Sequence, residues 1–389
     1  MATGKALTGP EPSLPPTHES FLIGVGRADC TGPPADIPLL KYGDLYRQDN
    51  VVLSGTHTHS GPAGYFQYTL FMISCKGFMK ESIEPLVNGI VKSIDIAHSS
   101  IRPGRIFRSR GELEDSSLNR SPHSYLNNPE SERHRYKWNT DKQVLVLKFT
   151  DLDGDGIGML SWFAVHAVSM NYTNRMVSSD NMGYASYLLE QDKNRGQLPG
   201  QGGFVAGFSS SNLGDVSPNT KGPHCMNTGL PCDYLNSSCP TKQCGAFGPG
   251  ADMFESTRII GHNIYMKELY GTAVEEVTGV LHLAHQWVNM TDVTVQINAT
   301  HTVSNTHIME NSFAAGTTDG GGDLNFTQGA VEGDPFWDGI RDALVGVPSN
   351  QTQACHHPKP ILFNTGEIVD VQIITVGSVA VVAVPGEMT

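Results

Sequence analysis

The stretch around which this chain is organised reads Val51-Val52-Leu53-Ser54-Gly55-Thr56-His57-Thr58-His59-Ser60-Gly61-Pro62. Its apolar, β-branched start predicts a buried strand that ends at Gly55. Because alternate side chains of an extended chain share a face, we expect His57 and His59 to point the same way. Two imidazoles at a strand end indicate a metal or acid/base site. The alternative is a pair of loop histidines that only form hydrogen bonds.

The composition is that of a folded protein. The chain has 389 residues, of which 39% are hydrophobic and 17% charged, enough for one large domain or two ordinary ones. Its net charge of −13, without a basic run, argues against nucleic acid as a partner, since phosphate binding needs clustered Lys and Arg. No apolar run reaches the length that spans a bilayer.

Two features indicate an exported protein. Asn-x-Ser/Thr sequons occur at Asn119, Asn171, Asn236, Asn289, Asn298, Asn325 and Asn350. One loop rich in small and turn-forming residues contains four cysteines, Cys225, Cys232, Cys239 and Cys244, which predicts a loop cross-linked by disulfides. A zinc knuckle is the alternative, although paired C-x-x-C units are missing. Residues 1–20 predict a flexible leader without the apolar core of a signal peptide, so we expect that the start of the natural protein is missing.

Alternating strands and helices, interrupted by hairpins, predict an α/β fold with a mixed sheet. Helices are expected at 82–98, 252–270 and 335–344, and a further helix is expected to begin with Asp180-Asn181 as its cap. Strands are expected at 21–26, 144–149, 158–165, 203–208, 287–297, 369–374 and 378–384. The acidic stretch Asp151–Gly156 predicts a hairpin turn rather than a calcium loop. The twelfth position holds Trp162 instead of a glutamate.

Potential metal ligands follow predicted strands at separate points of the chain. Beyond His57 and His59, the strand at 158–165 runs into His166, and the last strand is followed by Glu387. In α/β folds, the loops beyond strand ends converge on one site. Two imidazoles and one carboxylate suit a catalytic zinc, which keeps one position open for water. The alternative is that these residues are polar ends of core strands that meet solvent.

Several motifs strongly resemble the neutral ceramidase family. They are Gly55–Tyr65, Asn119–Pro122, Ser161–His166, Asp180–Tyr184, Ser211–Asn219 and the closing Pro385-Gly386-Glu387. The similarity runs from about residue 21 to the last residue. It implies a neutral-ceramidase-like catalytic domain that uses one zinc ion (Zn2+). The implied reaction is hydrolysis of the ceramide amide to sphingosine and a fatty acid, a step of sphingolipid catabolism.

The resemblance also implies roles for individual residues. His57, His166 and Glu387 correspond to zinc ligands, and His59 to the neighbouring acid/base or hydrogen-bonding residue. Ser217 corresponds to the active-site serine, and Arg120 to an arginine of the substrate pocket. The nucleophile that attacks the amide carbonyl could be a zinc-activated water or Ser217. We favour the water, because the sequence places no base near Ser217.

Without the resemblance, local patterns give plainer interpretations of three of these positions. Ser217 would start a turn before a proline, and Arg120 would be a surface cation. Asp215 is interpreted as a turn or cap residue.

The chain also departs from the family pattern. The family's fourth zinc ligand, a tyrosine, lies beyond Pro385-Gly386-Glu387, where this sequence stops. A segment near 35–41, a stretch between 367 and 368 and the C-terminal immunoglobulin-like domain are expected to be missing. The predicted organisation is thus a leader at 1–20 and an incomplete catalytic domain at 21–389. By resemblance, Cys225 pairs with Cys239 and Cys232 with Cys244, while Cys355 lacks a partner.

The resemblance further implies an extracellular or cell-surface ectodomain that acts on ceramide at a membrane surface. Two other functions are alternatives. One is a catalytically inactive truncated paralogue that binds lipid or partners without turnover. The other is a barrel-type metal amidohydrolase, which would need a later pair of strand-end histidines and a final aspartate.

Overall fold

A computed structural model describes residues 20–31, 42–65, 72, 75–235, 244–266, 270–289, 293–298, 301–305, 308–321, 326–364 and 368–388. Residues 1–19 of the predicted leader, the region near 35–41, Cys239 and the side chain of Cys355 lie outside the described residues. Among the described helices, none is both long and apolar enough to cross a bilayer.

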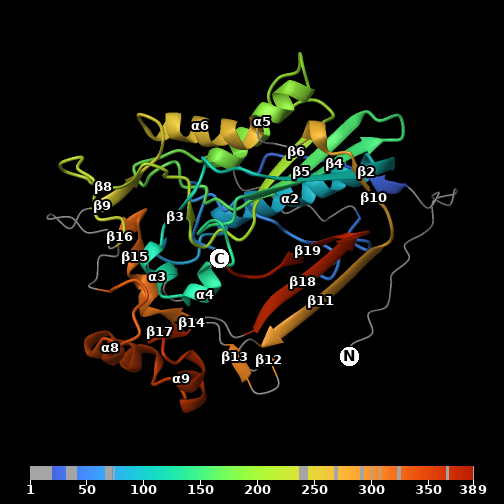
Figure 1. Cartoon of the computed structure of the whole chain (residues 1–389). Coiled ribbons are helices and arrows are strands. Elements are labelled where there is room, and N and C mark those ends of the chain that lie inside the picture. The colour runs from blue at the N-terminus through green and yellow to red at the C-terminus, as the bar shows by residue number, and fades with distance from the viewer. Residues whose placement is uncertain are drawn as a thin grey trace.

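A six-stranded mixed sheet forms the centre of the fold, in the order β1-β2-β4-β5-β6, with β10 pairing β2 next to β1 (Figure 1). Its strands are β1 (Phe21–Ile23), β2 (Arg102–Glu112), β4 (Gln143–Asp151), β5 (Gly156–Phe163), β6 (Val205–Ser210) and β10 (Glu275–Val277). Only the pair β5–β6 is parallel among these, and α5 (Asp180–Lys193) connects its strands. The structure confirms the predicted mixed α/β sheet.

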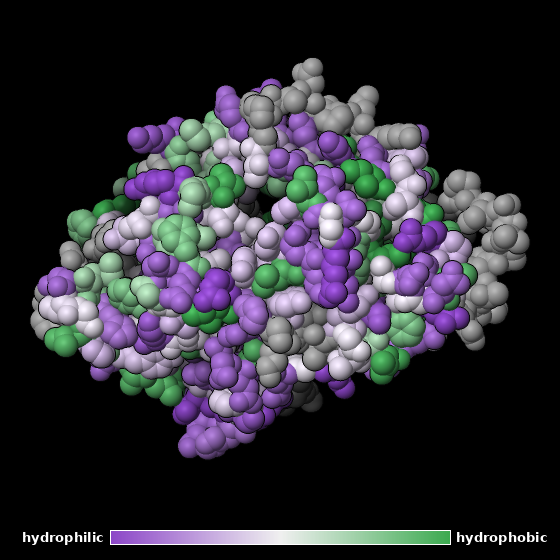
Figure 2. Space-filling model, turned by 90° about the horizontal axis from the view of Figure 1, so that it is seen from above, coloured by the Kyte–Doolittle hydropathy of each residue, from purple (hydrophilic) through white to green (hydrophobic). Residues whose placement is uncertain are grey.

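Helices α5 and α6 (Met253–Met266) cover one face of this sheet (Figure 1). On α5, Met182, Ala185 and Leu189 recur at helical spacing and are buried. They meet Val144 and Met159 of the sheet in one core cluster. Each fully buried side chain of this size contributes about 1.5–3 kcal/mol through the hydrophobic effect. From above, where these helices lie, hydrophobic and hydrophilic residues are interspersed on the surface (Figure 2).

A second core lies on the opposite face of the sheet. There Ile106 and Leu147 pack with Val379, which belongs to a three-stranded antiparallel sheet. The strands of that sheet are β11 (Leu281–Asn289), β18 (Ile368–Val376) and β19 (Val379–Ala383). Helix α2 (Lys80–Ser99) approaches the segment after β1 so closely that a Cβ at Gly24 would lie 1.9 Å from the carbonyl oxygen of Ala97.

Shorter elements complete the chain. They are β3 (Leu118–Asn119), α3 (Pro122–Leu126), α4 (Glu130–Arg133), β7 (Val216–Ser217), β8 (Gly222–Cys225), β9 (Cys244–Phe247), a 3-10 helix (Tyr270–Thr272), β12 (Val293–Asn298), β13 (His301–Asn305), β14 (Ile308–Glu310), α7 (Asn311–Ala314), β15 (Gly316–Thr317), β16 (Gly320–Gly321), α8 (Pro335–Val345), α9 (Asn350–His356) and β17 (Ile361–Asn364).

Most predicted elements are confirmed, including the β4–β5 hairpin. Its turn is held by the Asp151 carboxylate, which accepts the backbone N–H groups of Asp153 and Asp155 at 3.1 and 2.9 Å. The strands expected near 287–297 are β11 and β12, of which β11 begins earlier, at Leu281. Strand β2 was missed, because Pro103, Gly104 and several arginines hide its alternating burial.

Two local predictions were wrong. Residues 51–53 do not form a buried strand, and the side chain of Leu53 is 67% exposed. The segment meets the end of β6 through the Ser210 N–H, which donates to Gly55 O at 3.1 Å, but this contact does not extend into a ladder. The cap of α5 is Ser179 rather than Asp180. The Asp180 carboxylate instead accepts N–H groups from a neighbouring loop.

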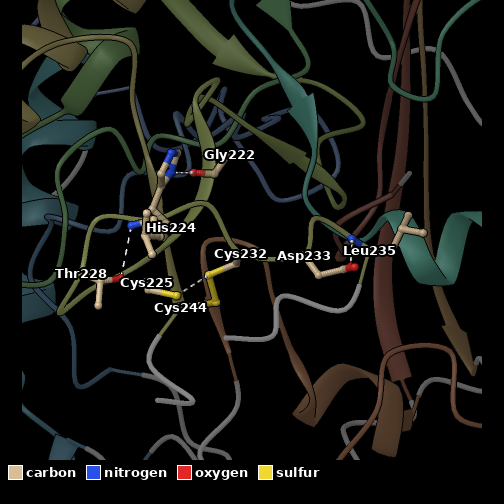
Figure 3. Close-up of a disulfide and its surroundings, with 9 residues drawn as sticks. Gly222, His224, Cys225, Thr228, Cys232, Asp233, Leu235 and Cys244 are labelled. Carbon is tan, nitrogen blue, oxygen red and sulfur yellow. Dashed lines mark hydrogen bonds between the residues drawn. A yellow bond between two sulfur atoms is a disulfide. The ribbon is translucent and has the colours of Figure 1, made fainter. Parts of the chain in front are cut away.

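The cysteine loop contains the predicted disulfide between Cys232 and Cys244, beside the β8–β9 hairpin (Figure 3). The Sγ of Cys225 lies 3.9 Å from the Sγ of Cys232, whereas its predicted partner Cys239 lies outside the described residues. A disulfide ties up two of the three described sulfurs. The geometry therefore favours the disulfide interpretation over the zinc knuckle.

The core under α6 provides a stability test. Ile260 is 0% exposed, so Ile260→Ala should lower the free energy of unfolding by about 2–5 kcal/mol, because it removes buried methyl groups and leaves a cavity. Leu344→Ala on α8 is the helical control, since Leu344 is 71% exposed. This substitution should change the free energy of unfolding by less than about 0.5 kcal/mol. Urea unfolding followed by circular dichroism measures both. Equal effects would contradict the assigned core.

Candidate metal centre

Three imidazoles converge although they come from distant parts of the chain. The segment that carries His57 and His59 runs beside the one that follows His166, where Thr58 pairs with Ala167 in a parallel bridge. The ring centroid of His57 lies 4.9 Å from that of His59 and 4.8 Å from that of His166. The three histidines each offer a ring nitrogen within 4.8 Å of the others. This cluster is a candidate metal centre.

The two nearby histidines do not converge through an extended strand, as the sequence had suggested. The backbone at His57 has φ 56°, in the left-handed region. Such a conformation costs on the order of 1–3 kcal/mol and persists where surrounding contacts hold it. Here the carbonyl of Thr56 accepts a hydrogen bond from Ser210 Oγ at 3.1 Å, and Thr58 Oγ1 donates to Ser178 O at 2.7 Å. These contacts aim the His57 ring at the cluster.

His166 is fully buried and held by its neighbours. Its Nδ1 forms a hydrogen bond with the carbonyl of Val216 at 2.9 Å, which assigns the proton to Nδ1 and leaves a lone pair on Nε2. Asn181 Nδ2 donates to the carbonyl of His166 at 3.0 Å and to Ser169 Oγ at 3.0 Å. Burial lowers the pKa of His166 and keeps the ring neutral, the form that binds a metal.

The carboxylate of Glu387 lies between two of the imidazoles. Its Oε1 is 3.1 Å from His57 Nε2, and its Oε2 is 3.2 Å from His166 Nε2. Burial opposes ionisation, yet the contacts with His166 and His57 hold the pKa of this carboxyl well below its usual range. The next residue is anchored, since Met388 O accepts a hydrogen bond from Gly214 N at 2.8 Å. The carboxylate is thus an anionic donor at the cluster.

The donor set fits a metal ion. His57 Nε2 is buried and has no hydrogen-bond partner among the described residues, because its contact with Glu387 lacks hydrogen-bond geometry. Ligands about 2.0–2.2 Å from a tetrahedral zinc lie roughly 3.3–3.5 Å from one another. The separations of 3.1 and 3.2 Å between Glu387 and the two imidazoles are close to that range. Imidazole and carboxylate are ligands that zinc accepts.

His59 stands at the rim of the cluster and is exposed on its outer side. Desolvation of the enclosed part of its ring, then the nearby His57 and His166, lower its pKa to about 4. Its imidazole is therefore neutral at neutral pH and offers a lone pair next to the other two rings.

Arg120 is not the surface cation that local patterns suggest. Its side chain is 14% exposed and donates to Gly214 O, at 3.1 Å from Nε and 2.9 Å from Nη2, while Nη2 lies 3.3 Å from Glu387 Oε2. It follows strand β3, which pairs with β7 and so places Arg120 beside the chain that carries Ser217. The structure thus brings Arg120 to the candidate metal centre.

Asn119 and Asp215 support this pairing. Asn119 is 0% exposed, and its Nδ2 donates to the Asp215 carboxylate at 2.6 Å. The first sequon is therefore buried, and a glycan at Asn119 is excluded. Asp215 is more than a turn residue, since its side chain links the two strand segments, and burial raises its pKa.

Ser217 is also fully buried, next to the residue whose carbonyl orients His166. Its hydroxyl donates to Asp319 Oδ1 at 2.5 Å. The sequence placed no base near Ser217, and Asp319 was missed. The two residues are separated by 102 positions, and the only local signal is a polar turn between glycines, which is ordinary.

These observations define an α/β protein with a candidate metal centre built from histidines and a glutamate. A family model described as "Neutral/alkaline non-lysosomal ceramidase, N-terminal" matches residues 38–389. The chain therefore belongs to the neutral/alkaline non-lysosomal ceramidase family.

Relatives support this assignment over part of their length. The chain is 46% identical to neutral ceramidase A of Dictyostelium discoideum over 366 residues, covering 89% of this chain and 51% of the relative. It is 41% identical to neutral ceramidase of Drosophila melanogaster over 453 aligned positions, covering 95% and 64%. The chain thus spans about half to two thirds of the length of these relatives.

Two solved structures share the fold. One, described as "Ceramidase complexed with C2", matches with a TM-score of 0.74 and 29% identity, covering 95% of this chain and 64% of that chain. The other is neutral ceramidase from Pseudomonas aeruginosa, with a TM-score of 0.69 and 27% identity, covering 94% and 62%.

The support behind His166 can be tested directly. Asn181→Ala should weaken metal binding at the candidate centre about 10- to 100-fold, because it removes the side chain that holds the His166 loop. Asn128→Ala is the matched control at an exposed position and should leave affinity unchanged. Competition with a chromogenic chelator measures both. An unchanged affinity in Asn181→Ala would refute its positioning role.

Proposed function

We propose that the chain catalyses zinc-dependent hydrolysis of the amide bond of ceramide (N-acylsphingosine), releasing sphingosine and a fatty acid. Membership of the family supports the substrate class. The observation that carries the proposal is the convergence of His57, His166 and Glu387, with contacts of 3.1 and 3.2 Å between the carboxylate and the two imidazoles.

In this proposal His57, His166 and Glu387 hold the ion. When bound, zinc supplies Lewis-acid chemistry, polarising an amide carbonyl and lowering the pKa of a water. Val216 O and Asn181 keep His166 oriented for this task. His59, a neutral imidazole at the rim, is placed to take or return a proton near the scissile bond.

Arg120 and Ser217 complete the proposed site. Arg120 balances the charge of Glu387 from 3.3 Å and is a candidate donor to a polar substrate group. Ser217 either positions the substrate head group while water attacks, or attacks the carbonyl itself. We favour the first, in which the serine binds and does not form an acyl bond.

We also propose that residues 21–389 form one catalytic domain that lacks an internal segment of its relatives. The alignment with the Drosophila relative spans 453 positions, more than the 389 residues of this chain, so that the relative has residues without a counterpart here. Exposed sequons at Asn171 and Asn350 are compatible with a glycosylated ectodomain acting on ceramide at a membrane surface and serving sphingolipid catabolism.

The proposal predicts about one bound zinc per chain and release of fatty acid from a fluorescent short-chain ceramide. Chelation should abolish release, and added zinc should restore it. His166→Ala should lower both zinc stoichiometry and kcat/KM, the latter by at least about 100-fold, because it removes a ligand. Metal analysis and chromatographic separation of the products provide the two readouts.

Leu344→Ala is the control, since it changes an exposed residue of α8 outside the candidate site. A folded, zinc-loaded wild-type chain that releases no fatty acid would overturn the hydrolytic proposal. If such a chain still bound ceramide, the alternative of an inactive lipid-binding paralogue would replace it.

A further inference from the structure

A carboxylate lies directly against the hydroxyl of Ser217. Asp319 Oδ1 accepts a hydrogen bond from Ser217 Oγ at 2.5 Å and another from Asn219 Nδ2 at 2.8 Å. The backbone N–H of Asn219 donates to Ser217 Oγ at 3.0 Å. Ser217 is 0% exposed and Asn219 is 7% exposed, so these bonds form within the protein.

The hydrogen-bonding capacity of Ser217 follows from these contacts. A hydroxyl has one donor and two acceptor positions. Asp319 takes the donor, and Asn219 N–H takes one acceptor position. The remaining position of Oγ is a lone pair. The serine therefore has no donor left and can only accept a further hydrogen bond.

The position of Asp319 is set by backbone contacts. It lies in the turn between β15 and β16, where its N–H donates to Thr317 Oγ1 at 3.2 Å. The neighbouring Thr318 is 0% exposed, and its N–H donates to Arg120 O at 2.8 Å. The turn is thus fastened to the segment that carries Arg120, so the Asp319 carboxylate is preorganised.

The second oxygen of Asp319 forms an ion pair but no hydrogen bond. Its Oδ2 lies 3.7 Å from Arg120 Nη1 and is buried without a hydrogen-bond partner among the described residues. A buried oxygen of this kind is costly unless a partner satisfies it. Among the described residues, the charge of Arg120 is what offsets this cost.

We propose that Asp319 is a positioning residue that takes the only proton of the Ser217 hydroxyl and so orients this serine as a hydrogen-bond acceptor in the proposed reaction. This inference deepens the proposed function and rests on it.

The test is a double-mutant cycle on the zinc-loaded protein with wild type, Ser217→Ala, Asp319→Ala and the double variant. If Asp319 acts through Ser217, Asp319→Ala should lower kcat/KM for short-chain ceramide about 10-fold or more in wild type, but less than about 2-fold in the Ser217→Ala background. Equal losses in both backgrounds would show a merely structural role and overturn the inference.

Three further measurements keep the outcomes distinct. Asp319→Asn keeps the shape and one acceptor oxygen and should recover part of the loss, which guards against misfolding of Asp319→Ala. Asp153→Asn, in the exposed β4–β5 turn, is the matched control and should behave as wild type. Zinc content should stay unchanged in all Asp319 variants, since this carboxylate does not touch the cluster.

The Kd of short-chain ceramide, measured by calorimetry over the same cycle, separates the two proposals. If wild type binds ceramide but does not hydrolyse it, the proposed function fails while the cycle in Kd still decides the role of Asp319. If wild type neither binds nor hydrolyses ceramide, both proposals are overturned.

Discussion

The contact on which the site depends is that of the Glu387 carboxylate with the imidazoles of His57 and His166. The ionised Glu387 contacts the ring of His57, from the first part of the chain, and the fully buried ring of His166. The side chain of Glu387 is 40% exposed, and Arg120 lies 3.3 Å from its Oε2 as a partner of opposite charge. The carboxylate thus adds a third donor to two imidazoles whose segments share no secondary-structure element.

Arg120 connects this anion to a second one. Its guanidinium lies between Glu387 and Asp319, at 3.3 and 3.7 Å, and its backbone is fastened to both Asp215 and Thr318. The β3–β7 pairing supplies the frame, since it places Arg120 and Ser217 on neighbouring segments. The candidate metal ligands and the serine thus belong to one polar network. Arg120, whose side chain is 14% exposed, is the cation that its two carboxylates share.

Much of the regular structure could be predicted from local pattern. Helix α6 and the strands β4 to β6 show periodic apolar residues, and buried ones among them form the cores. The periodicity of α2 predicted that helix, although α2 adds no residue to either core cluster. Patterns failed where tertiary contacts compete with them. Strand β2 is rich in arginine and glycine but pairs with three other strands, β1, β4 and β10. Asp180 has φ 54°, and its carboxylate accepts hydrogen bonds from a neighbouring loop.

The sequence by itself determined the fold class, because the periodicity of apolar residues is a local property. The candidate ligands and the disulfide partner of Cys232 came from the resemblance of its motifs to the neutral ceramidase family. Only the tertiary structure decided how His57 reaches the cluster, that Asn119 is buried, and that Asp319 meets Ser217. Those facts depend on a strained backbone angle and on contacts such as the one between residues 102 positions apart. No local pattern records such contacts, since strand pairing and turn geometry create them.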